Sequence, residues 1–240
     1  QAFWIGRVGG GKIDALHFSA RLTGLFTPEE SGVHRVGIYS AGRSRIFVEG
    51  KLVADNWTNW EKGRTFFEEG SDEVVGEVLL EAGRAYPVVI EFVTKEFATL
   101  GLAAFAAGIG RPLGDEAIAE AVRVAREAET AVVFIGRNGE WDTEGSDLLD
   151  ITLPGRQNEL VAAVAAANPR TVVVLQSGGP VEMPWLDQVA AVVSAWYPGQ
   201  EAGNAIADVL VGAAEPGGRL PQSFPVRWND NPAHSQDREI

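Results

Sequence analysis

The chain of 240 residues contains no cysteine, which excludes disulfide bonds, thiolate zinc sites, iron–sulfur clusters and a cysteine nucleophile. Its three histidines, His17, His34 and His234, lie far apart without the spacing of metal ligands. No apolar run approaches the roughly 20 residues that a membrane-spanning helix needs. Twenty basic against 33 acidic residues give a net charge of −13, which disfavours binding to phosphate backbones. We therefore expect no metal, no cofactor, no nucleic-acid partner and no membrane span.

The two ends of the chain lack the usual terminal signals. The chain begins Gln-Ala-Phe-Trp, with no initiator Met and no basic segment followed by an apolar one, as a secretory leader would have. It ends on a polar run from Asn229 to Ile240. We interpret it as a segment of a longer polypeptide. The compartment stays open, because a protein without cysteine fits a secreted or periplasmic location as well as the cytoplasm.

The first half of the sequence is typical of β structure. Short apolar or alternating runs are separated by glycine-bearing turns such as Glu49-Gly50-Lys51 and Ala82-Gly83-Arg84. The expected strands are residues 46–48, 52–54, 74–80, 86–92 and 100–105. Strands at intervals of roughly ten residues suggest a β-sandwich or small barrel. We expect no helix before about residue 112.

The second half alternates helical and strand patterns. The expected helices are residues 115–129, 157–167 and 202–211, and the expected strands are residues 131–136, 171–175 and 190–195. Buried apolar strands alternating with helices predict a parallel sheet covered on both faces. Ligands bind at the carboxyl ends of such strands. This points to the loops after Ile135, Leu175 and Ala195.

A glycine- and proline-bearing segment, Gly108-Ile109-Gly110-Arg111-Pro112, separates the two patterns and is the predicted hinge. We expect an all-β domain at residues 1–110 and an α/β domain at residues 111–240, an α+β multidomain segment overall. The charge agrees with this division, because residues 1–110 carry a net charge of −3 and residues 111–240 carry −10.

Two local motifs have plain explanations. Residues 6–12 match a phosphate-binding loop up to Lys12, but Ile13 stands where Ser or Thr would hold Mg²⁺, so we interpret them as a flexible glycine-rich loop. Asn56-Trp57-Thr58 is a glycosylation sequon, which matters only in a eukaryotic secretory pathway. Isolated sequons also arise by chance.

The most informative stretch is residues 136–147, Gly-Arg-Asn-Gly-Glu-Trp-Asp-Thr-Glu-Gly-Ser-Asp. Four carboxylates follow a buried strand directly and lie beside Trp141. Carboxylates held close together raise one another's pKa, which is how a general acid stays protonated near neutral pH. The residue types alone leave two interpretations open, a solvated acidic loop and a catalytic one.

Five motifs resemble glycoside hydrolase family 3. Residues 137–154 are similar to the family's acid/base loop, which in many members reads E-W-E-x-E-G-x-D-R before an L-P-G-x-Q helix start. The other motifs, in the family's order, are residues 168–175, 177–185, 195–203 and 217–225. The resemblance implies a β-glucosidase, a retaining glycoside hydrolase whose second catalytic domain is an (α/β)₆ sandwich.

Residues 18–32 and 40–56 resemble a PA14 domain. A subgroup of family 3 β-glucosidases carries such a domain inserted into the (α/β)₆ sandwich. The resemblance implies that this chain is the insert followed by an incomplete sandwich domain, and that a (β/α)₈ barrel of the same protein lies upstream. Ca²⁺-dependent PA14 lectins use adjacent paired aspartates, and this chain has no Asp-Asp pair, so we expect no Ca²⁺ there.

The resemblance also assigns roles. In the family, an Asp on the barrel attacks the anomeric carbon, and a Glu on the second domain protonates the leaving oxygen and then activates water. That Glu falls on Glu144, with Glu140 as the fallback, and the nucleophile is absent from this chain, which we expect to be inactive alone. The loop departs from the family pattern at Asp142, where Glu is common, and at Leu148, where Arg is usual.

Four aromatic residues are candidates for binding the substrate, because aromatic faces stack on sugar rings and aryl aglycones. Trp60, Phe66 and Phe67 lie on one aromatic-rich loop of the PA14-like part, and Trp141 lies beside the acid/base loop. The three in the first half fit a sandwich core equally well.

Three hypotheses follow. The first is the C-terminal part of a β-glucosidase acting on a small β-glucoside or oligosaccharide. The second is a non-catalytic carbohydrate-binding PA14 module joined to a degenerate hydrolase domain, with Leu148 as its mark. The third is a flavodoxin-like nucleotide binder. The sequence leaves open the aglycone, glucosidase against xylosidase preference, and whether the protein is a homo-oligomer.

Overall fold

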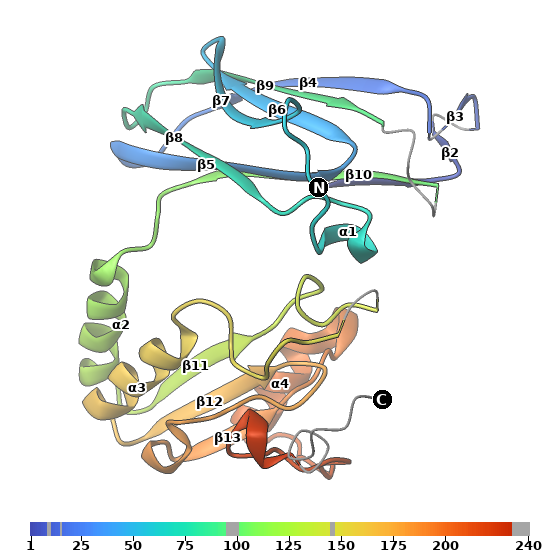
Figure 1. The fold of residues 1–240 in the computed structure, drawn as a ribbon. Helices are drawn as coiled ribbons and strands as arrows, with labels where there is room; N and C mark the ends of the chain where they lie inside the picture. The colour runs from blue at the N-terminus through green and yellow to red at the C-terminus, as the bar shows by residue number, and fades with distance from the viewer. Residues whose placement is uncertain (9–10, 15, 95–100, 145–146, 232–240) are drawn as a thin grey trace. The chain divides into compact units, whose positions relative to one another are not determined.

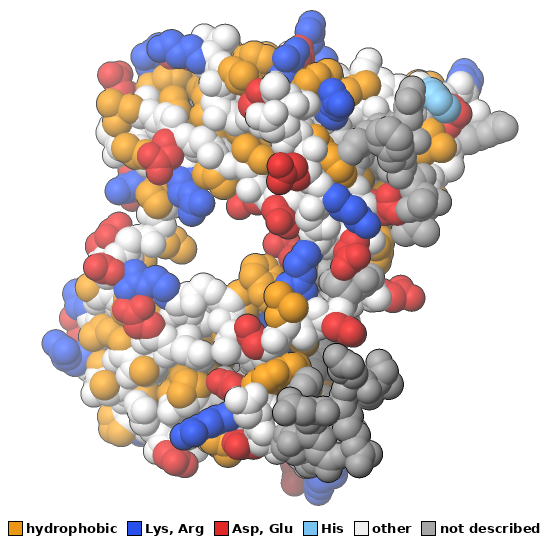
Figure 2. Space-filling model, viewed as in Figure 1, with side chains coloured by type: hydrophobic (Ala, Val, Ile, Leu, Met, Phe, Trp, Pro, Cys, Tyr) orange, Lys and Arg blue, Asp and Glu red, His pale blue; other side chains and the backbone are white. Residues whose placement is uncertain are grey.

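The computed structural model describes residues 1–231 except 9–10, 15, 95–100 and 145–146. The chain divides into two compact units, Gln1–Leu113 with Thr143–Ser146, and Gly114–Asp142 with Asp147–Ile240. Figure 1 shows strands in the first unit and mixed helices and strands in the second. Figure 2 shows basic and acidic side chains interspersed on the visible face of each unit.

The first unit contains two four-stranded antiparallel sheets. One sheet has the order β1 (Ala2–Ile5), β10 (Leu102–Gly110), β5 (Gly32–Ala41) and β8 (Val74–Leu80). The other has the order β4 (Ser19–Phe26), β9 (Tyr86–Val93), β6 (Arg43–Val48) and β7 (Lys51–Asn56). A short pair, β2 (Arg7–Val8) and β3 (Ile13–Asp14), follows β1. Lys12 therefore leads into a strand and not into the helix of a phosphate loop.

The two sheets of this unit pack face to face, as Figure 1 shows. Val36 and Ile38 of β5 pack against Ile46 and Val48 of β6, and all four side chains are buried. The chain crosses from one sheet to the other at Gly42, whose φ is 137°. A Cβ at this position would lie 2.5 Å from the ring of Phe92, so glycine is required for this crossing.

A buried polar cluster lies inside the first unit. The side-chain amide of Asn56 donates to the hydroxyls of Ser71 at 2.7 Å and Ser40 at 2.9 Å, and Ser40 is bonded to Ser44 at 2.7 Å. All four residues are at most 2% exposed. The asparagine of the sequon is therefore inside the folded unit and out of reach of a glycosylating enzyme.

A short helical turn, α1 (Thr65–Glu68), corrects the expectation of no helix before residue 112. Its residues Phe66, Phe67 and Glu68 have φ values of 51°, 59° and 61°, which belong to the left-handed region. The turn is closed by bonds from the Thr65 hydroxyl to the Ser71 carbonyl and from the Gly70 amide to the Thr65 carbonyl. No periodic pattern marks a left-handed turn, so the sequence did not predict it.

The predicted hinge is also corrected. Gly108, Ile109 and Gly110 are the last residues of β10, paired with Gly37, Val36 and Arg35 of β5. Both glycines are therefore paired strand residues and do not form a flexible joint here.

The second unit contains a parallel sheet with the order β11 (Ala131–Gly136), β12 (Thr171–Gln176) and β13 (Ala191–Ser194). Its helices are α2 (Asp115–Glu127), α3 (Gln157–Ala167) and α4 (Ala202–Leu210), with 3₁₀ turns η1 (Leu186–Gln188), η2 (Gly199–Glu201) and η3 (Trp228–Asp230). The predicted alternation of strands and helices and the parallel sheet are confirmed. Asp115 and Glu116 in the first turn stabilise α2, because their negative charges lie at the positive end of the helix dipole.

The sheet is covered differently on its two faces at β11. Val133 and Ile135 are buried in a core that includes Ala125 of α2 and Val161 of α3. Phe134, whose side chain points to the opposite face, is 54% exposed, and Val132 is also exposed. The prediction of a sheet covered on both faces is therefore wrong at this strand within the described residues. The strand is apolar throughout, so its composition could not distinguish the covered face from the exposed one.

Candidate active site

The loops after the three parallel strands meet at Asp142. Because the strands are parallel, their carboxyl ends lie at one edge of the sheet. The Asp142 carboxylate oxygen Oδ2 accepts a bond of 2.8 Å from the amide of Gly178, after β12, and one of 2.5 Å from the hydroxyl of Tyr197, after β13. Asp142 itself lies on the loop after β11. The three loops to which the sequence points therefore lie together, and ligand binding at them stays a prediction.

Arg137 is the first residue after β11, and its side chain is completely buried. Its Nη2 donates to the carbonyl of Thr152 at 2.9 Å, and its Nη1 lies 3.5 Å from Asp142 Oδ1. Its Nε and Nη1 have no hydrogen-bond partner. A buried guanidinium needs a nearby negative charge. The Asp142 side chain, 13% exposed, supplies that charge.

Asn138 shapes the backbone of the loop that contains the predicted acid/base. Its carbonyl accepts bonds of 3.0 Å from the amides of both Trp141 and Asp142. Its side-chain oxygen accepts a bond of 3.0 Å from the amide of Glu140. Asparagine commonly closes turns in this way. The turn fixes the backbone of three consecutive residues, Glu140, Trp141 and Asp142.

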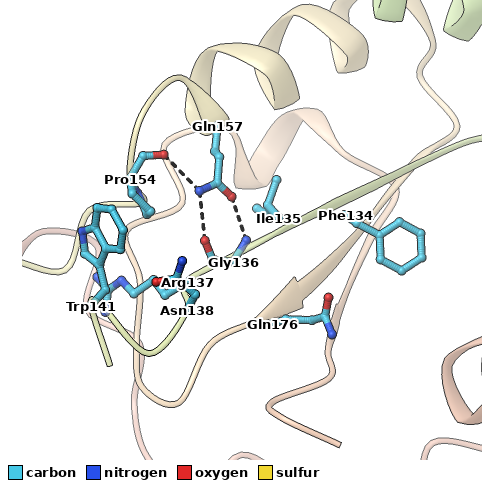
Figure 3. A pocket seen from close by; sticks show the side chains of 9 residues that line it. All are labelled: Phe134, Ile135, Gly136, Arg137, Asn138, Trp141, Pro154, Gln157 and Gln176. Carbon is cyan, nitrogen blue, oxygen red and sulfur yellow. Dashed lines mark hydrogen bonds between the residues drawn. The ribbon is translucent and has the colours of Figure 1, made fainter. Parts of the chain in front are cut away.

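The side chain of Gln157, the first residue of α3, is hydrogen-bonded to the end of β11. Its Oε1 accepts a bond of 2.7 Å from the amide of Gly136, and its Nε2 donates to the carbonyls of Gly136 and Pro154 at 2.9 and 3.0 Å, as Figure 3 shows. The side chain thus satisfies backbone groups at the end of an edge strand. A Cβ at Gly136 would lie 1.9 Å from the carbonyl oxygen of Gln176, so glycine is required for this close approach.

A cavity of about 310 Å³ opens beside this loop. Its lining comes from the end of β11, the acidic loop, the start of α3 and the end of β12: Phe134, Ile135, Gly136, Arg137, Asn138, Trp141, Pro154, Gln157 and Gln176. Trp141 is 37% exposed. An exposed indole beside polar amide groups is suited to contact a sugar ring.

The surroundings of Tyr197 change its acidity. Burial of the hydroxyl and its hydrogen bond to the Asp142 carboxylate raise the pKa of Tyr197 to about 12. The hydroxyl also lies 3.2 Å from the carbonyl oxygen of Arg137. Both effects favour the neutral phenol, so Tyr197 keeps its proton and acts as a donor to Asp142 at physiological pH.

The residues predicted to perform acid/base catalysis have different surroundings. Glu144 is exposed, two residues after Asp142, and is followed by Gly145 and Ser146, which lie outside the described residues. Glu140 is half-buried within the Asn138 turn. Leu148, which replaces the family's usual Arg, is half-buried. The structure thus places Glu140, Trp141 and Glu144 on one loop.

The predicted aromatic residues of the first unit differ in exposure. The indole nitrogen of Trp60 donates to the carbonyl of Ser40 at 3.1 Å. Phe66 packs against Tyr39, with ring centroids 5.3 Å apart. Phe67 is 44% exposed. Trp60 and Phe66 are half-buried, and Phe67 of the three presents the most surface to solvent.

Sequence reasoning missed the residues that hold the loop, namely Arg137, Gln157, Gly178 and Tyr197. Arg137, Gly178 and Tyr197 lie within three residues of the end of a parallel strand, and Gln157 begins the helix α3, at the end of the sheet where the sequence predicts a site. That position was the available signal. Their bonding partners could not be predicted, because the bonds join segments as far apart as 60 residues in the sequence.

The described part of the chain offers no metal site and no spanning helix. No cluster of three or more His, Asp or Glu side chains there is arranged to hold a metal ion. Nor does any helix among those residues have the length and apolar character needed to cross a membrane.

Comparisons with known proteins agree on one family. The family model described as "Glycosyl hydrolase family 3 C-terminal domain" matches residues 19–239. A beta-glucosidase of Rhizobium radiobacter is 50% identical over 242 residues, covering 100% of this chain and 30% of that protein. Beta-glucosidase B of Emericella nidulans is 45% identical, covering 90% of this chain and 27% of that protein.

A solved structure is also similar. The crystal structure of a beta-glucosidase from Kluyveromyces marxianus in complex with glucose has a TM-score of 0.85 and 42% identity, covering 91% of this chain and 26% of that one. All of these relatives are glycoside hydrolases by name. The chain belongs to glycosyl hydrolase family 3, through the C-terminal domain of that family. It spans no more than 30% of the length of the relatives described here.

Proposed function

We propose that this chain is part of a retaining β-glucosidase that hydrolyses terminal β-D-glucosyl residues, with Glu144 as its general acid/base. Glu144 protonates the leaving oxygen in the first step and activates water in the second. The nucleophile is an Asp on a (β/α)₈ barrel of the same protein, outside these 240 residues. In retaining glycosidases the two carboxyl groups stand about 5–5.5 Å apart, so the barrel has to bring its Asp close to this loop.

The observation that supports this role best is the contrast between Glu144 and Asp142. Asp142 is tied to two other strand-end loops, whereas Glu144 is exposed. A general acid needs access to the substrate oxygen and a defined position, and an exposed carboxyl near an anchored residue has both. The family membership and the beta-glucosidase names of the relatives support the reaction class.

The test is Glu144→Gln in the full-length protein, measured on β-glucosides with good and poor leaving groups. Loss of a general acid lowers kcat/KM by roughly 10²–10⁴-fold where the leaving group needs a proton, and much less for an activated aryl leaving group. Glu129→Gln is the matched control, because the Glu129 side chain is 84% exposed and its ion-pair partner is Arg170 on the surface.

The fallback is tested in the same assay with Glu140→Gln. If Glu140→Gln shows the leaving-group-dependent loss and Glu144→Gln does not, the acid/base is Glu140. If both variants hydrolyse every substrate as the parent does, neither residue is the acid/base and the proposal is wrong.

We further propose that the first unit is the PA14-type insert of this family and that its aromatic turn contacts the aglycone. Phe67 is the exposed residue of that turn, and Trp60 and Phe66 support it from within the unit. Trp141, which lines the cavity beside the acidic loop, contacts the sugar in this proposal.

One sequence feature favours a second candidate function, a carbohydrate-binding protein without hydrolytic activity. Leu148 removes a positive charge from the acidic loop. In that case the full-length protein retains glycan binding and hydrolyses no β-glucoside. Hydrolysis that depends on Glu144 excludes it.

A further inference from the structure

Asp142 is held from three directions within the second unit. Its Oδ2 receives the Gly178 amide and the Tyr197 hydroxyl, and its Oδ1 faces Arg137 at 3.5 Å. A Cβ at Gly178 would lie 3.1 Å from the Tyr197 ring and 3.3 Å from Asp142 Oδ2, so a side chain there would crowd the group. We call Arg137, Asp142, Gly178 and Tyr197 the loop clasp.

Within the loop clasp, the positive charge of Arg137 is paired with the negative charge of Asp142. Arg137 is buried, with its Nε and Nη1 lacking hydrogen-bond partners. Asp142 is the carboxylate paired with it. Without the Asp142 charge, the guanidinium would remain buried with only the Thr152 carbonyl as a partner for Nη2. The pairing therefore favours a loop conformation that keeps Asp142 next to Arg137.

The clasp acts on the segment that contains both candidate acids. Asp142 lies two residues from Glu140 and two residues from Glu144. The amides of Glu140, Trp141 and Asp142 are all bonded to Asn138, so the backbone from residue 138 to residue 142 forms one turn fixed at Asp142. Glu144 is exposed and follows Asp142 by two residues, so a shift of the Asp142 backbone also shifts the peptide that leads to Glu144.

We propose that Asp142, held by Tyr197 and Gly178 and paired with Arg137, is the positioning residue for the acid/base loop, with Tyr197 fixing the orientation of its carboxylate. This inference rests on the proposed function of Glu144. Asp142 acts through the loop and does not itself transfer a proton to the substrate. A displacement of about 1 Å at a catalytic group can cost about 10²-fold in rate, so loosening the clasp affects catalysis.

The expected signature is a dependence on the leaving group. A misplaced acid slows reactions whose leaving oxygen must be protonated and spares those whose leaving group departs unprotonated. In the full-length protein, Asp142→Asn lowers kcat/KM on an alkyl β-glucoside by about 10²-fold and on a dinitrophenyl β-glucoside by less than about 5-fold. Tyr197→Phe shows the same pattern with a loss of about tenfold. Asp142→Glu, which keeps the carboxylate, recovers most of the activity.

A second readout does not depend on activity. Hydrogen exchange of the Trp141 and Asp142 amides, measured in the full-length protein, accelerates in Tyr197→Phe and in Asp142→Asn, because both loosen the turn. Tyr86→Phe is the matched control. It also removes a tyrosine hydroxyl, one that accepts a bond from the Glu81 amide in the first unit, and it leaves both readouts at this loop unchanged.

The outcomes separate this inference from the proposed function. If Glu144→Gln shows the leaving-group-dependent loss but Asp142→Asn and Tyr197→Phe lower activity equally on all substrates, or not at all, the clasp does not position the acid. If Glu144→Gln has no effect, the proposed function fails, whereas faster amide exchange would still establish the clasp as an anchor of the loop. If Asp142→Asn does not fold, the half-exposed Tyr197 provides the test through Tyr197→Phe.

Discussion

At the scale of single residues, two carboxylates separated by one residue have opposite surroundings. Asp142 is largely buried and receives two donors, whereas Glu144 is exposed. The sequence places both in one acidic stretch and cannot tell them apart, because the donors come from distant loops. In our proposal the two residues therefore have different roles: Asp142 holds the loop, and Glu144 contacts the substrate.

The environment of Tyr197 predicts that its hydroxyl loses its proton at a higher pH than that of an ordinary tyrosine. Its pKa is raised to about 12, first by burial and then by the bond to Asp142. A folded-state pKa above the ordinary value of about 10 adds stability that is fully present below pH 10 and is lost as the pH rises from 10 to 12. We expect the ultraviolet tyrosinate signal of the full-length protein to contain a component in this range that Tyr197→Phe lacks.

A contrary result would be equally clear. If the difference between the parent and Tyr197→Phe titrates near pH 10, the hydroxyl is not bonded to a carboxylate in solution. The Tyr197 ring is half-exposed, so solvent reaches it and its hydroxyl can titrate without global unfolding of the protein.

At the scale of elements, the sequence predicts the second unit well. The helix at residues 157–167 and the strand at residues 131–136 have the predicted bounds, because their apolar spacing is uninterrupted and Pro154-Gly155 marks the helix start. In the first unit, residues 74–80 and 86–92 were predicted within one residue. The strands β4 and β5 were not predicted, since glycine and polar residues interrupt their apolar pattern.

Elements set by long-range contacts were not predicted. The left-handed turn at Phe66–Glu68 depends on the bond from Thr65 to Ser71, and the exposed face of β11 depends on which side α2 and α3 cover. For the candidate site, the sequence indicated the strand-end loops and the family motif. The hydrogen bonds and the ion pair of the loop clasp could be found only from the structure. The predicted domain boundary and catalytic roles remain predictions.

Asn56 belongs to the buried serine–asparagine cluster, whereas Thr58 of the same sequon is exposed. We therefore expect a substitution of Asn56 to lower the stability of the protein and a substitution of Thr58 to have little effect. Asn56→Ala removes the amide that donates to the Ser40 and Ser71 hydroxyls, and the loss of a buried hydrogen-bond partner costs about 1–3 kcal/mol. Thermal or denaturant unfolding of the full-length protein measures the loss.

Thr58→Ala is the matched control, because it abolishes the same sequon at an exposed position and removes only a bond to Asp55. It is expected to change the free energy of unfolding by less than about 1 kcal/mol. Equal losses in Asn56→Ala and Thr58→Ala, or a glycan on Asn56 after expression in a eukaryotic secretory host, would contradict the buried placement of Asn56.

At the scale of the whole molecule, the chain is one part of a larger catalytic system in our proposal. It spans no more than 30% of the length of the relatives described here, and the proposed nucleophile lies outside it. What the second unit contributes is the end of a parallel sheet at which three loops are joined through Asp142, two residues before the exposed Glu144. This arrangement suits an acid that must protonate a substrate bound mainly by another domain.

The most direct test of the central claim is azide rescue of Glu144→Ala in the full-length protein, with an activated aryl β-glucoside as the substrate. In a retaining mechanism the glycosyl-enzyme intermediate still forms, and azide replaces water without needing a base. We expect azide to restore turnover and the product to be β-glucosyl azide, with the configuration of the substrate retained. Turnover equal to the parent without azide, or a glycosyl azide of inverted configuration, would contradict it.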